Sequence, residues 1–590
     1  MIRIIRRLAR YLGHYKLYVI IAPLFMIGEV FLELRMPLMM ARIVDAGIPQ
    51  RDLGFILRTG GVMILLALGG MLCGVANMVT SSIAAQGFGW NVRKALFARI
   101  TSFAFSDIDR FSTASLVTRM TSDTTQLQNT FMMTLRLMIR APFMMVFALV
   151  LAIGIHARLA AILLVAIPLL SFGIFFIMSR AEKLFAAMQR KIDALNGTVQ
   201  ENLIAVRVVK AFVREAHERS KFRKSNDELR QAGVRAATLV ITIMPMMTLV
   251  MNMATLAVLW FGGRLVGAGE LTTGKLISFI QYITQILMSL MMVSMVFLMS
   301  ARARACGNRV VEVLDTEPAI RDEERAALLT DDGEEQEDKR VTAGRIEFRD
   351  VSFRYPGGGS GEDVLTGITF TAEPGEVVAI VGGTGTGKTS LVQLVPRLYD
   401  ATGGQVLIDG VDVREYPLRP LRQSIGVVLQ NNLLFSGTIR DNLLWGDDYA
   451  DDESVEAAAR TAQAHGFVTG FPDGYDTMLG QGGVNVSGGQ KQRLCIARAL
   501  LRKPRILILD DSTSAVDSDT ERSIRTAFRE GLADTTVLLI AQRISSVSWA
   551  DRILVLDNGQ LVGNGTHAEL LRTCPVYAEI CATQIEGGAA

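Results

Sequence analysis

A glycine-rich stretch between residues 382 and 389 combines the residue types that bind a phosphate chain. It reads Gly-Gly-Thr-Gly-Thr-Gly-Lys-Thr and fits the P-loop pattern G-x-x-x-x-G-K-[ST]. Glycines let consecutive backbone N–H groups face an anion, and the following helix directs its positive dipole end at the same group. We expect Lys388 to reach the terminal phosphates of a nucleoside triphosphate and Thr389 to ligate Mg²⁺. The residues predicted to contact the nucleotide here are Gly382, Thr384, Gly385, Gly387, Lys388, Thr389 and Ser390.

The segments on either side of this stretch have the composition of a strand and a helix. Residues 377–381 form an unbroken apolar run, typical of a buried strand, and residues 390–394 open a helical pattern. Strand, loop and helix in this order are the context that the P-loop pattern requires. A glycine-rich turn without a ligand is therefore the less favoured interpretation.

Three other segments contain residues suited to nucleotide chemistry. An apolar run at 506–509 predicts a buried strand that ends in Asp510, the Walker B arrangement, in which the carboxylate holds Mg²⁺ directly or through water. Tyr355 precedes a proline and could stack on an adenine ring, or it could be a simple edge-strand aromatic. Small residues between the P-loop and Asp510 open another helix, whose N-terminus could hold a phosphate. They are Ser487, Gly488, Gly489 and Gln490.

The elements before these motifs are far more apolar than those of an ordinary soluble chain. Half of the 590 residues are hydrophobic, and mean hydropathy is +0.32. Most of six apolar segments reach the ~20 residues that cross a bilayer. The net charge of +3 argues against a nucleic-acid partner. The five cysteines lack metal-binding spacing, which indicates reduced or buried thiols rather than a disulfide framework. The segments are roughly 17–43, 55–84, 137–155, 159–178, 236–263 and 276–300.

Lysine and arginine set the expected orientation of these segments. They are dense at 1–18, a basic amphipathic stretch expected to lie along the inner membrane surface, and at 180–235. The short connections carry few, so both ends of the chain are predicted to be cytoplasmic. The long inner connections are helical in pattern. Near 106–113 and 209–218 we predict short tip helices suited to docking on another domain.

Charged and methionine side chains occur at membrane depth. Glu29 and Glu33, and likewise Arg136 and Arg140, are spaced four residues apart and share a helical face. Either pair could serve function, form an interhelical ion pair or, for arginine, extend to the interface. The fifth and sixth segments are methionine-rich, which suits a surface for varied apolar ligands or ordinary packing. These methionines are Met244, Met246, Met247, Met251, Met253, Met288, Met291, Met292, Met295 and Met299.

The chain divides into two predicted domains joined by an acidic linker. Residues 1–310 are assigned to an α-helical transmembrane domain of six spanning helices with long cytoplasmic extensions. Residues 311–343 form the solvated linker, which is rich in aspartate and glutamate. Residues 344–590 are assigned to an α/β P-loop domain that binds the nucleotide.

These motifs, in this order, resemble the ATP-binding-cassette family, and the resemblance covers nearly the whole chain. A six-span half placed before the cassette is similar to an exporter-type (type IV) half-transporter. The resemblance makes Gln430 the Q-loop residue beside the catalytic centre and the metal, Tyr355 the A-loop aromatic, and 514–517 the D-loop, which ends in Asp517.

The same resemblance implies a second chain. The family places ATP and Mg²⁺ between the P-loop of one cassette and the signature motif of another, here 487–490. This chain has one cassette, so the resemblance implies pairing with a second half-transporter chain. Residues 108–111 and 209–212 match the regions of the family's coupling helices.

The sequence departs from the family at the catalytic positions. The family's glutamate after Walker B is Asp511, whose side chain is shorter by one methylene, about 1.5 Å. The switch histidine is replaced by Gln542, and an amide cannot carry a proton as imidazole does. Gln481 also stands where the family often has a glutamate before the signature.

This pattern resembles the degenerate-site subunit of a heterodimeric multidrug exporter of the bacterial inner membrane. Such a translocase moves hydrophobic or amphipathic drugs or lipids outward, in contact with membrane lipid. Its own motifs line the weak ATP site, and its signature completes the strong one. A lipid, peptide or siderophore carrier on the same fold remains an alternative, as does a non-hydrolytic ATP-gated channel or sensor. No peptidase domain precedes the first span, which weighs against a leader-cleaving peptide exporter.

Overall fold

The computed structural model describes residues 6–321, 340–356, 362–511 and 517–586, which form two compact units. The first comprises Met1–Thr101 and Ala114–Thr316 and is helical. The second comprises Ser102–Thr113 and Glu317–Ala590 and contains the described strands. The segment Ser102–Thr113 therefore belongs to the second unit by its contacts, although its chain neighbours belong to the first.

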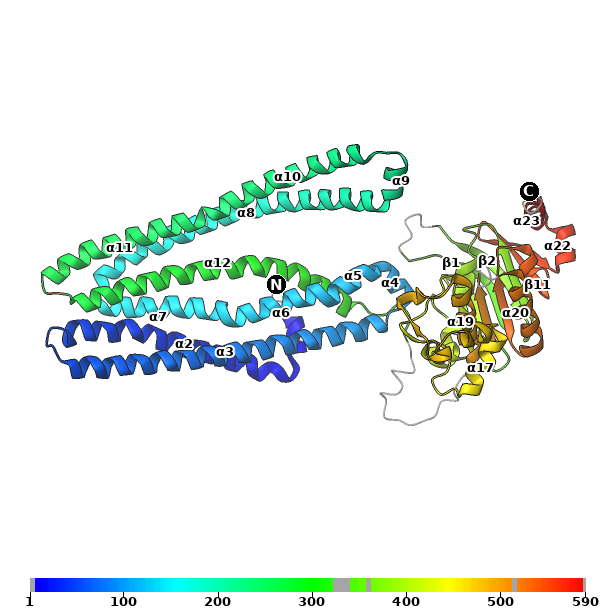
Figure 1. The fold of residues 1–590 in the computed structure, drawn as a ribbon, viewed down its shortest axis with the longest axis horizontal. Coiled ribbons are helices and arrows are strands. Elements are labelled where there is room, and N and C mark those ends of the chain that lie inside the picture. Colours follow the sequence, from blue (N-terminus) through cyan, green and yellow to red (C-terminus); the bar gives the residue numbers. More distant parts are fainter. Residues whose placement is uncertain (1–5, 322–339, 357–361, 512–516, 587–590) are drawn as a thin grey trace. The chain divides into compact units, whose positions relative to one another are not determined.

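The first unit is a bundle of long helices (Figure 1). Six helical segments of the described chain are long and apolar enough to cross a membrane, which confirms the predicted number. They contain α2 (Lys16–Arg42), α3 (Leu53–Thr101), α7 (Ile139–Ile155), α8 (Ala157–Ile204), α11 (Ile243–Gly267) and α12 (Thr273–Asp315). The connecting helical elements are η1 (Ala9–Tyr15), η2 (Ile43–Gly47), α5 (Thr113–Thr118), η3 (Arg119–Asp123), α6 (Thr124–Met133), η4 (Thr134–Met138), α9 (Val206–Ala211) and α10 (Glu215–Ile241).

Two of these helices are much longer than a bilayer requires. The helix α3 has 49 residues and α8 has 48. At 1.5 Å per residue each is ~70 Å long, against a hydrocarbon core of ~30 Å. Figure 1 shows α8 and α10 side by side along this extension. The helices α3 and α8 therefore continue well past the membrane, as the polar sequences of the inner connections predict.

Both predicted tip helices are present, but the second begins earlier than expected. The helix α4 (Phe105–Phe111) begins one residue before the predicted range and ends before Ser112, whose φ is 56°. The second, α9, spans Val206–Ala211 rather than the predicted range starting at Val209. Val213 adopts a left-handed φ of 54°, which no helix continues, so α10 starts afresh at Glu215.

The last long helix continues into the predicted linker. The helix α12 ends at Asp315, beyond residue 310, where the predicted transmembrane domain ends. Val310, Val313 and Leu314 are buried, and their spacing keeps one face of the helix packed. Residues 322–339, the most acidic part of the linker, lie outside the described residues.

The second unit contains one mainly parallel sheet and one antiparallel sheet. The six-stranded sheet has the order β12-β11-β3-β10-β9-β6, with only β12 antiparallel to its neighbour. Its strands are β3 (Val377–Gly382), β6 (Ile425–Val428), β9 (Ile506–Asp510), β10 (Thr536–Ile540), β11 (Arg552–Asp557) and β12 (Gln560–Gly565). The antiparallel sheet, in the order β2-β1-β4-β5, contains β1 (Ile346–Phe353), β2 (Leu365–Ala372), β4 (Gly403–Ile408) and β5 (Val411–Asp412), and a third sheet pairs β7 (Gly437–Thr438) with β8 (Met478–Leu479).

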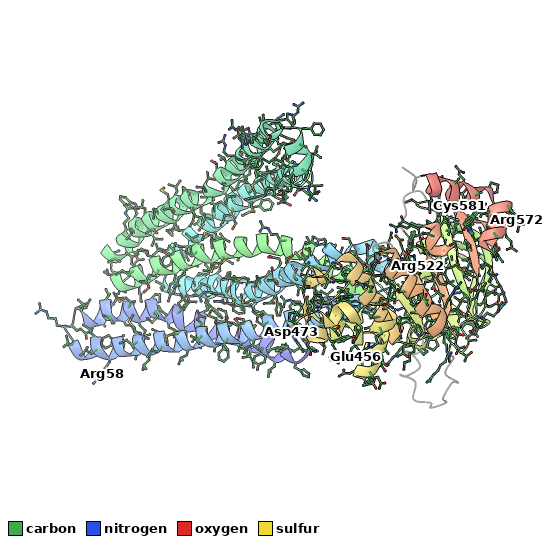
Figure 2. All side chains as sticks on the ribbon, turned by 45° about the vertical axis from the view of Figure 1, so that its right-hand side comes forward. Arg58, Glu456, Asp473, Arg522, Arg572 and Cys581 are labelled. Atoms are coloured by element: carbon green, nitrogen blue, oxygen red, sulfur yellow. The ribbon has the colours of Figure 1, made fainter. Side chains whose placement is uncertain are left out.

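Helices and short turns complete this unit. Successive aliphatic residues of β3, β9 and β10 belong alternately to two buried hydrophobic clusters, so the parallel sheet is covered on both faces. Exposed charged side chains such as Asp473, Arg522 and Arg572 extend from the surface, whereas Cys581 is buried (Figure 2). The helices are α14 (Lys388–Leu394), α15 (Leu418–Gln423), α16 (Ile439–Leu444), α17 (Asp452–Thr461), α18 (His465–Thr469), α19 (Gly488–Leu501), α20 (Ser518–Gly531), α21 (Ile544–Val547), α22 (His567–Thr573) and α23 (Pro575–Glu586), with 3₁₀ turns η5 (Val413–Glu415), η6 (Gly474–Asp476) and η7 (Gln481–Gly483).

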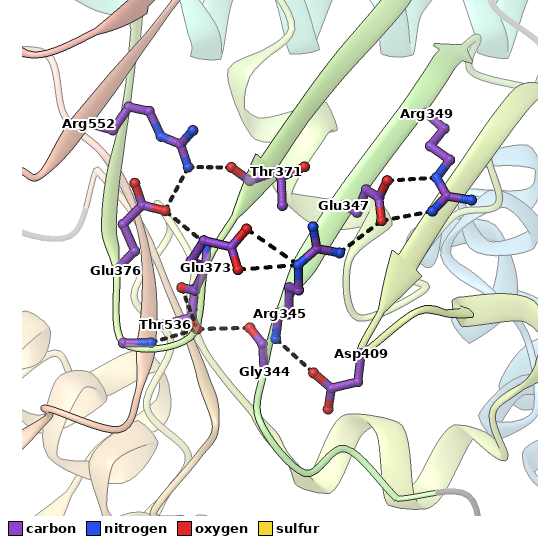
Figure 3. A network of polar contacts seen from close by, with 11 residues as sticks. Gly344, Arg345, Glu347, Arg349, Thr371, Glu373, Glu376, Asp409, Thr536 and Arg552 are labelled. Atoms are coloured by element: carbon purple, nitrogen blue, oxygen red, sulfur yellow. Dashed lines mark hydrogen bonds and ion pairs between the residues drawn. The ribbon is translucent and has the colours of Figure 1, made fainter.

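A polar network joins the two larger sheets at the base of β3 (Figure 3). Arg552 of β11 donates to the carboxylate of Glu376 at 2.6 Å and to the backbone carbonyl of Thr371 on β2. Arg345, just before β1, pairs with Glu373 at 3.2 Å, in the turn between β2 and β3. These contacts anchor the strand that leads directly into the glycine-rich stretch.

Candidate functional site

The predicted site residues gather at the carboxyl ends of four parallel strands. Gly382 ends β3, Asp510 ends β9, and Gln430 and Gln542 lie just beyond β6 and β10. These strands are adjacent in the order β3-β10-β9-β6, so their carboxyl ends meet along one edge of the sheet. Ligands of open α/β sheets bind at such an edge.

The backbone of the glycine-rich stretch forms a cradle that only glycine can build. Gly387 has a φ of +90°, and a Cβ there would lie 2.7 Å from the side chain of Leu365. A Cβ on Gly382 would lie 2.2 Å from the carbonyl oxygen of Leu556. The loop is therefore held close against the neighbouring strands and turns directly into α14. This geometry fits the phosphate chain of a nucleotide.

The side chain of Lys388 folds back over this cradle. Its Nζ donates to the carbonyl oxygens of Gly382 at 2.9 Å and Gly383 at 2.5 Å. Burial lowers the pKa of Lys388, and the nearby carboxylates of Asp510 and Asp511 oppose that shift. A phosphate in the cradle would supply negative charge that stabilises the buried ammonium group of Lys388.

Thr389 and Asp510 provide an oxygen-rich position for a divalent cation. The Thr389 hydroxyl donates to Asp510 Oδ1 at 3.2 Å, and Asp510 is only 2 % exposed. Burial raises the pKa of Asp510, with a further contribution from the charge of Asp511. Hydroxyl and carboxylate oxygens fit Mg²⁺, whose charge would favour the ionised carboxylate. Mg²⁺ bound here would neutralise charge on the terminal phosphates of ATP.

Two glutamine side chains are hydrogen-bonded to Asp511, the predicted general base. Gln542 Nε2 donates to Asp511 Oδ2 at 2.7 Å, and Gln430 also hydrogen-bonds the Asp511 carboxyl group. The sequence also predicts Gln430 as a metal ligand, and in the structure its side chain contacts Asp511. Burial raises the pKa of Asp511, while the two hydrogen bonds lower it. Asp511 also adopts a left-handed φ of 49°, a conformation uncommon for residues other than glycine.

The signature residues 487–490 start a well-capped helix. Ser487 is the N-cap of α19, and its hydroxyl accepts from the Gln490 backbone N–H at 3.3 Å. The Gln490 side chain accepts in return from the Ser487 N–H at 2.9 Å, which completes a capping box. Ser487 and Gly488 are exposed, and Gly489 is half-buried in the first turn. The start of this helix is therefore accessible to a ligand.

The two remaining predicted nucleotide contacts have different surroundings. Asp517 is the N-cap of α20 and accepts from the backbone N–H of Thr520 at 2.9 Å. The other D-loop residues, 514–516, lie outside the described residues. The Tyr355 hydroxyl lies 2.9 Å from the Ser390 hydroxyl, so its ring lies beside the helix that follows the cradle.

Two residues of this region were missed by sequence reasoning. Gln492 of α19 is 3 % exposed and donates to the backbone carbonyl of Asp511 at 3.4 Å. Tyr399 is 6 % exposed and packs edge-on against Tyr355, with ring centroids 5.2 Å apart. A polar residue near the start of the signature helix was a usable signal for Gln492. Tyr399 carries no local pattern that singles it out.

Comparison with known proteins agrees with this arrangement. Residues 19–290 match the family model described as the ABC transporter transmembrane region, and residues 365–514 match the model described as ABC transporter. The chain is 41% identical over 577 residues to the uncharacterized ABC transporter ATP-binding protein YfiB of Bacillus subtilis, with 97% of each chain covered. This chain belongs to the ABC transporter family.

Other relatives place it among the exporters of that family. The chain is 35% identical over 499 residues to the ATP-dependent lipid A-core flippase of Aromatoleum aromaticum, covering 84% of this chain and 80% of the relative. A solved bacterial Atm1-family ABC exporter with ATP bound has a TM-score of 0.77 at 26% identity, with 98% of each chain covered. The chain is thus an ABC exporter half-transporter, a multi-pass membrane protein that carries its own ATPase domain.

In the membrane half of this ABC chain, the intramembrane charges form an ion pair between helices. Arg140 of α7 contacts Glu29 of α2 and pairs with Glu33 at 2.6 Å, which agrees with the ion-pair interpretation. Arg136 lies one turn earlier, in η4. Among the methionines, Met247 is buried, whereas Met288 is 45% exposed. The side chains of Met295 and Met299 lie outside the described residues.

Proposed function

We propose that this chain is the degenerate-site subunit of a heterodimeric ABC exporter in the bacterial cytoplasmic membrane. It binds Mg-ATP at its own site, hydrolyses it slowly, and supplies its signature residues to the catalytic site of a second half-transporter. The observation that carries this proposal is the 2.7 Å hydrogen bond from Gln542 to the Asp511 carboxylate.

This hydrogen bond concerns the step in which water attacks the terminal phosphate. A general base must accept a proton from that water, and it works best when it is positioned within hydrogen-bond reach. Asp511 is about 1.5 Å shorter than glutamate, and the Gln542 amide occupies one of its oxygens. Gln542 cannot exchange a proton in the manner of histidine. The proposal keeps ATP binding at this site, because Lys388 lies over the glycine-rich cradle and Thr389 is hydrogen-bonded to Asp510.

The signature supports the second half of the proposal. Exposed Ser487 and Gly488 stand at the capped start of α19, where backbone N–H groups can face a phosphate. Donors aimed at charge that develops in the transition state are worth ~10²–10³ in turnover. A chain that completes its partner's site is expected to combine an intact signature, here 487–490, with a weakened general base, here Asp511.

The proposed substrates are amphipathic drugs or lipids moved outward. The sequence relationship to a lipid A-core flippase favours a lipid among these. Met288 is exposed and half-buried Met292 lies one helical turn further along α12, which suits an adaptable apolar surface. The lysine and arginine distribution favours cytoplasmic N- and C-termini.

The test compares two substitutions in the complex of this chain with its partner half-transporter. We expect Ser487→Arg to lower ATP turnover by ~10²-fold, and Asp511→Asn to lower it by less than about twofold, since that base is already weak. Ser487→Thr keeps a capping hydroxyl and is the matched control. Loss of turnover in Asp511→Asn with Ser487→Arg fully active would show that the roles of the two sites are reversed.

The chain without a partner provides a second test. A purified homodimer should hydrolyse ATP far below typical enzyme rates of ~1–10 s⁻¹. A homodimer that reaches those rates would disprove the degenerate-site proposal. An assembled complex that binds ATP but never hydrolyses it would instead favour an ATP-gated channel or sensor.

A further inference from the structure

Tyr399 connects a tip helix to the core of the cassette. Its side chain is 6 % exposed, and its hydroxyl donates to Asp109 Oδ2 of α4 at 2.7 Å. Both residues belong to the second compact unit. Burial, together with the hydrogen bond to Asp109, raises the pKa of Tyr399, so its hydroxyl stays protonated and able to donate. The ring of Phe105, at the start of α4, lies 6.1 Å from the Tyr399 ring and adds an apolar contact.

The opposite side of Tyr399 faces the aromatic residue expected at the adenine. The rings of Tyr399 and Tyr355 meet at 88°, with centroids 5.2 Å apart. Phe353 completes the group and packs edge-on against both rings, at 4.8 Å from Tyr355 and 5.6 Å from Tyr399. The Tyr355 hydroxyl is paired with Ser390, one residue after Thr389 in the phosphate-binding stretch. An unbroken series of contacts therefore runs from α4 to the nucleotide site.

This series leaves the Tyr355 ring little freedom to move alone. Protein interiors are packed about as densely as organic crystals, so a ring held edge-on by two others cannot turn without displacing them. An adenine stacked on Tyr355 would fix the orientation of that ring. The same contact would favour one position of Tyr399, whose hydroxyl is bonded to Asp109.

We propose that Tyr399 is a positioning residue that couples adenine binding at Tyr355 to the docking of α4. Asp109 and Tyr399 hold the Tyr355 ring ready for the base, and the bound base in return stabilises α4 on the cassette. Coupling of this kind is reciprocal, so each event strengthens the other by the same factor. The proposal depends on adenine stacking at Tyr355 but not on the hydrolysis rate of the site or on the identity of the partner.

The position of α4 in the chain gives this coupling a consequence. The segment that contains it directly follows α3 and precedes α5, both parts of helical segments that contain candidate membrane spans. Tightening of α4 when the base binds would therefore reach two helical segments through the covalent chain. A triphosphate without a base would fill the cradle but would not engage Tyr355.

The experiment uses two probes that share a triphosphate chain, one with adenosine attached and one without it. The full-length chain is purified in detergent, and the binding of Mg-ATP and of magnesium tripolyphosphate is measured by displacement of a fluorescent nucleotide. In Tyr399→Phe, which keeps the ring and removes the hydroxyl, we expect the Mg-ATP dissociation constant to rise about 3- to 10-fold. We expect the tripolyphosphate constant to stay within twofold of the wild type. Asp109→Ala should reproduce both results.

Tyr416→Phe is the matched control. Tyr416 is 4 % exposed in the same hydrophobic cluster, and its hydroxyl donates to the Ile408 carbonyl at 2.9 Å and not to a residue of α4. This variant should bind both probes as the wild type does. Equal weakening of both probes in Tyr399→Phe, unchanged Mg-ATP binding, or the same change in Tyr416→Phe would overturn the proposal.

Hydrogen exchange tests the reciprocal effect on α4. In the wild type, Mg-ATP should slow the exchange of the amides of 105–111 by at least about threefold relative to tripolyphosphate. Tyr399→Phe should abolish that difference between the probes. A difference that persists in the variant would show that α4 responds to the base by another route.

Discussion

Restoring both missing catalytic groups should raise ATP hydrolysis at the chain's own site. Asp511→Glu extends the carboxylate by about 1.5 Å, and Gln542→His introduces an imidazole that can donate to a phosphate and titrate near neutral pH. A misplacement of about 1 Å at a reacting group can cost ~10²-fold in rate. We therefore expect the double variant to hydrolyse ATP about 10²-fold faster than the wild-type chain.

The structure indicates that neither substitution suffices alone. Gln542 Nε2 lies 2.7 Å from Asp511 Oδ2, so a glutamate introduced at 511 still meets the same amide. Hydrogen bonds to charged groups contribute ~1.5–3 kcal/mol. This free energy corresponds to roughly a tenfold to hundredfold preference for the state in which the carboxylate at position 511 is hydrogen-bonded to the Gln542 amide. Each single variant should gain less than tenfold, and the effects should be non-additive because the two side chains touch.

The assay measures phosphate release by the purified chain as a homodimer, in which its intact signature faces each restored site. Gln584→His is the matched control, because Gln584 donates to the Gln542 carbonyl at 2.7 Å, through which it contacts the same loop, and makes no described contact with Asp511. It should leave the rate unchanged. A double variant that binds ATP normally, forms the dimer and turns over no faster than the wild type would refute the reasoning.

Three further predictions concern the membrane helices and the phosphate site. Replacing Met288 and Met292 by alanine in the assembled exporter should change which substrates are transported while ATP binding persists, and an unchanged substrate profile would favour simple packing. Arg140→Met leaves two carboxylates unpaired and should destabilise the chain by ~3–5 kcal/mol, seen as a lower thermal midpoint, whereas Glu33→Gln should cost less because Arg140 keeps its contact with the other glutamate. Because burial lowers the pKa of Lys388, Mg-ATP affinity should fall as the pH rises through that lowered pKa, below the ordinary lysine value of ~10.4; a flat affinity profile up to that pH would contradict the shift.

The sequence by itself determined the parts of the molecule that depend on local pattern. Six apolar segments of spanning length became six candidate membrane helices, because a bilayer selects for length and hydropathy alone. The run from Gly382 to Thr389 identified the phosphate cradle, since each glycine and the lysine has a role fixed by its place in the motif. Helix ends were less accurate: α9 starts at Val206, before the predicted tip, because the backbone leaves the helical region at Ala205, and no residue type there signals it.

Only the tertiary structure decided how separate segments meet. Gln430, Asp511 and Gln542 follow three different strands and come together because β6, β9 and β10 are neighbours in one parallel sheet. Tyr399 reaches Asp109 across 290 positions of the chain. Strand order and docking are set by burial summed over the whole domain, and no local pattern at these residues encodes it. The sequence therefore identified the residues that differ from the family, and the fold showed that two of them are hydrogen-bonded to each other.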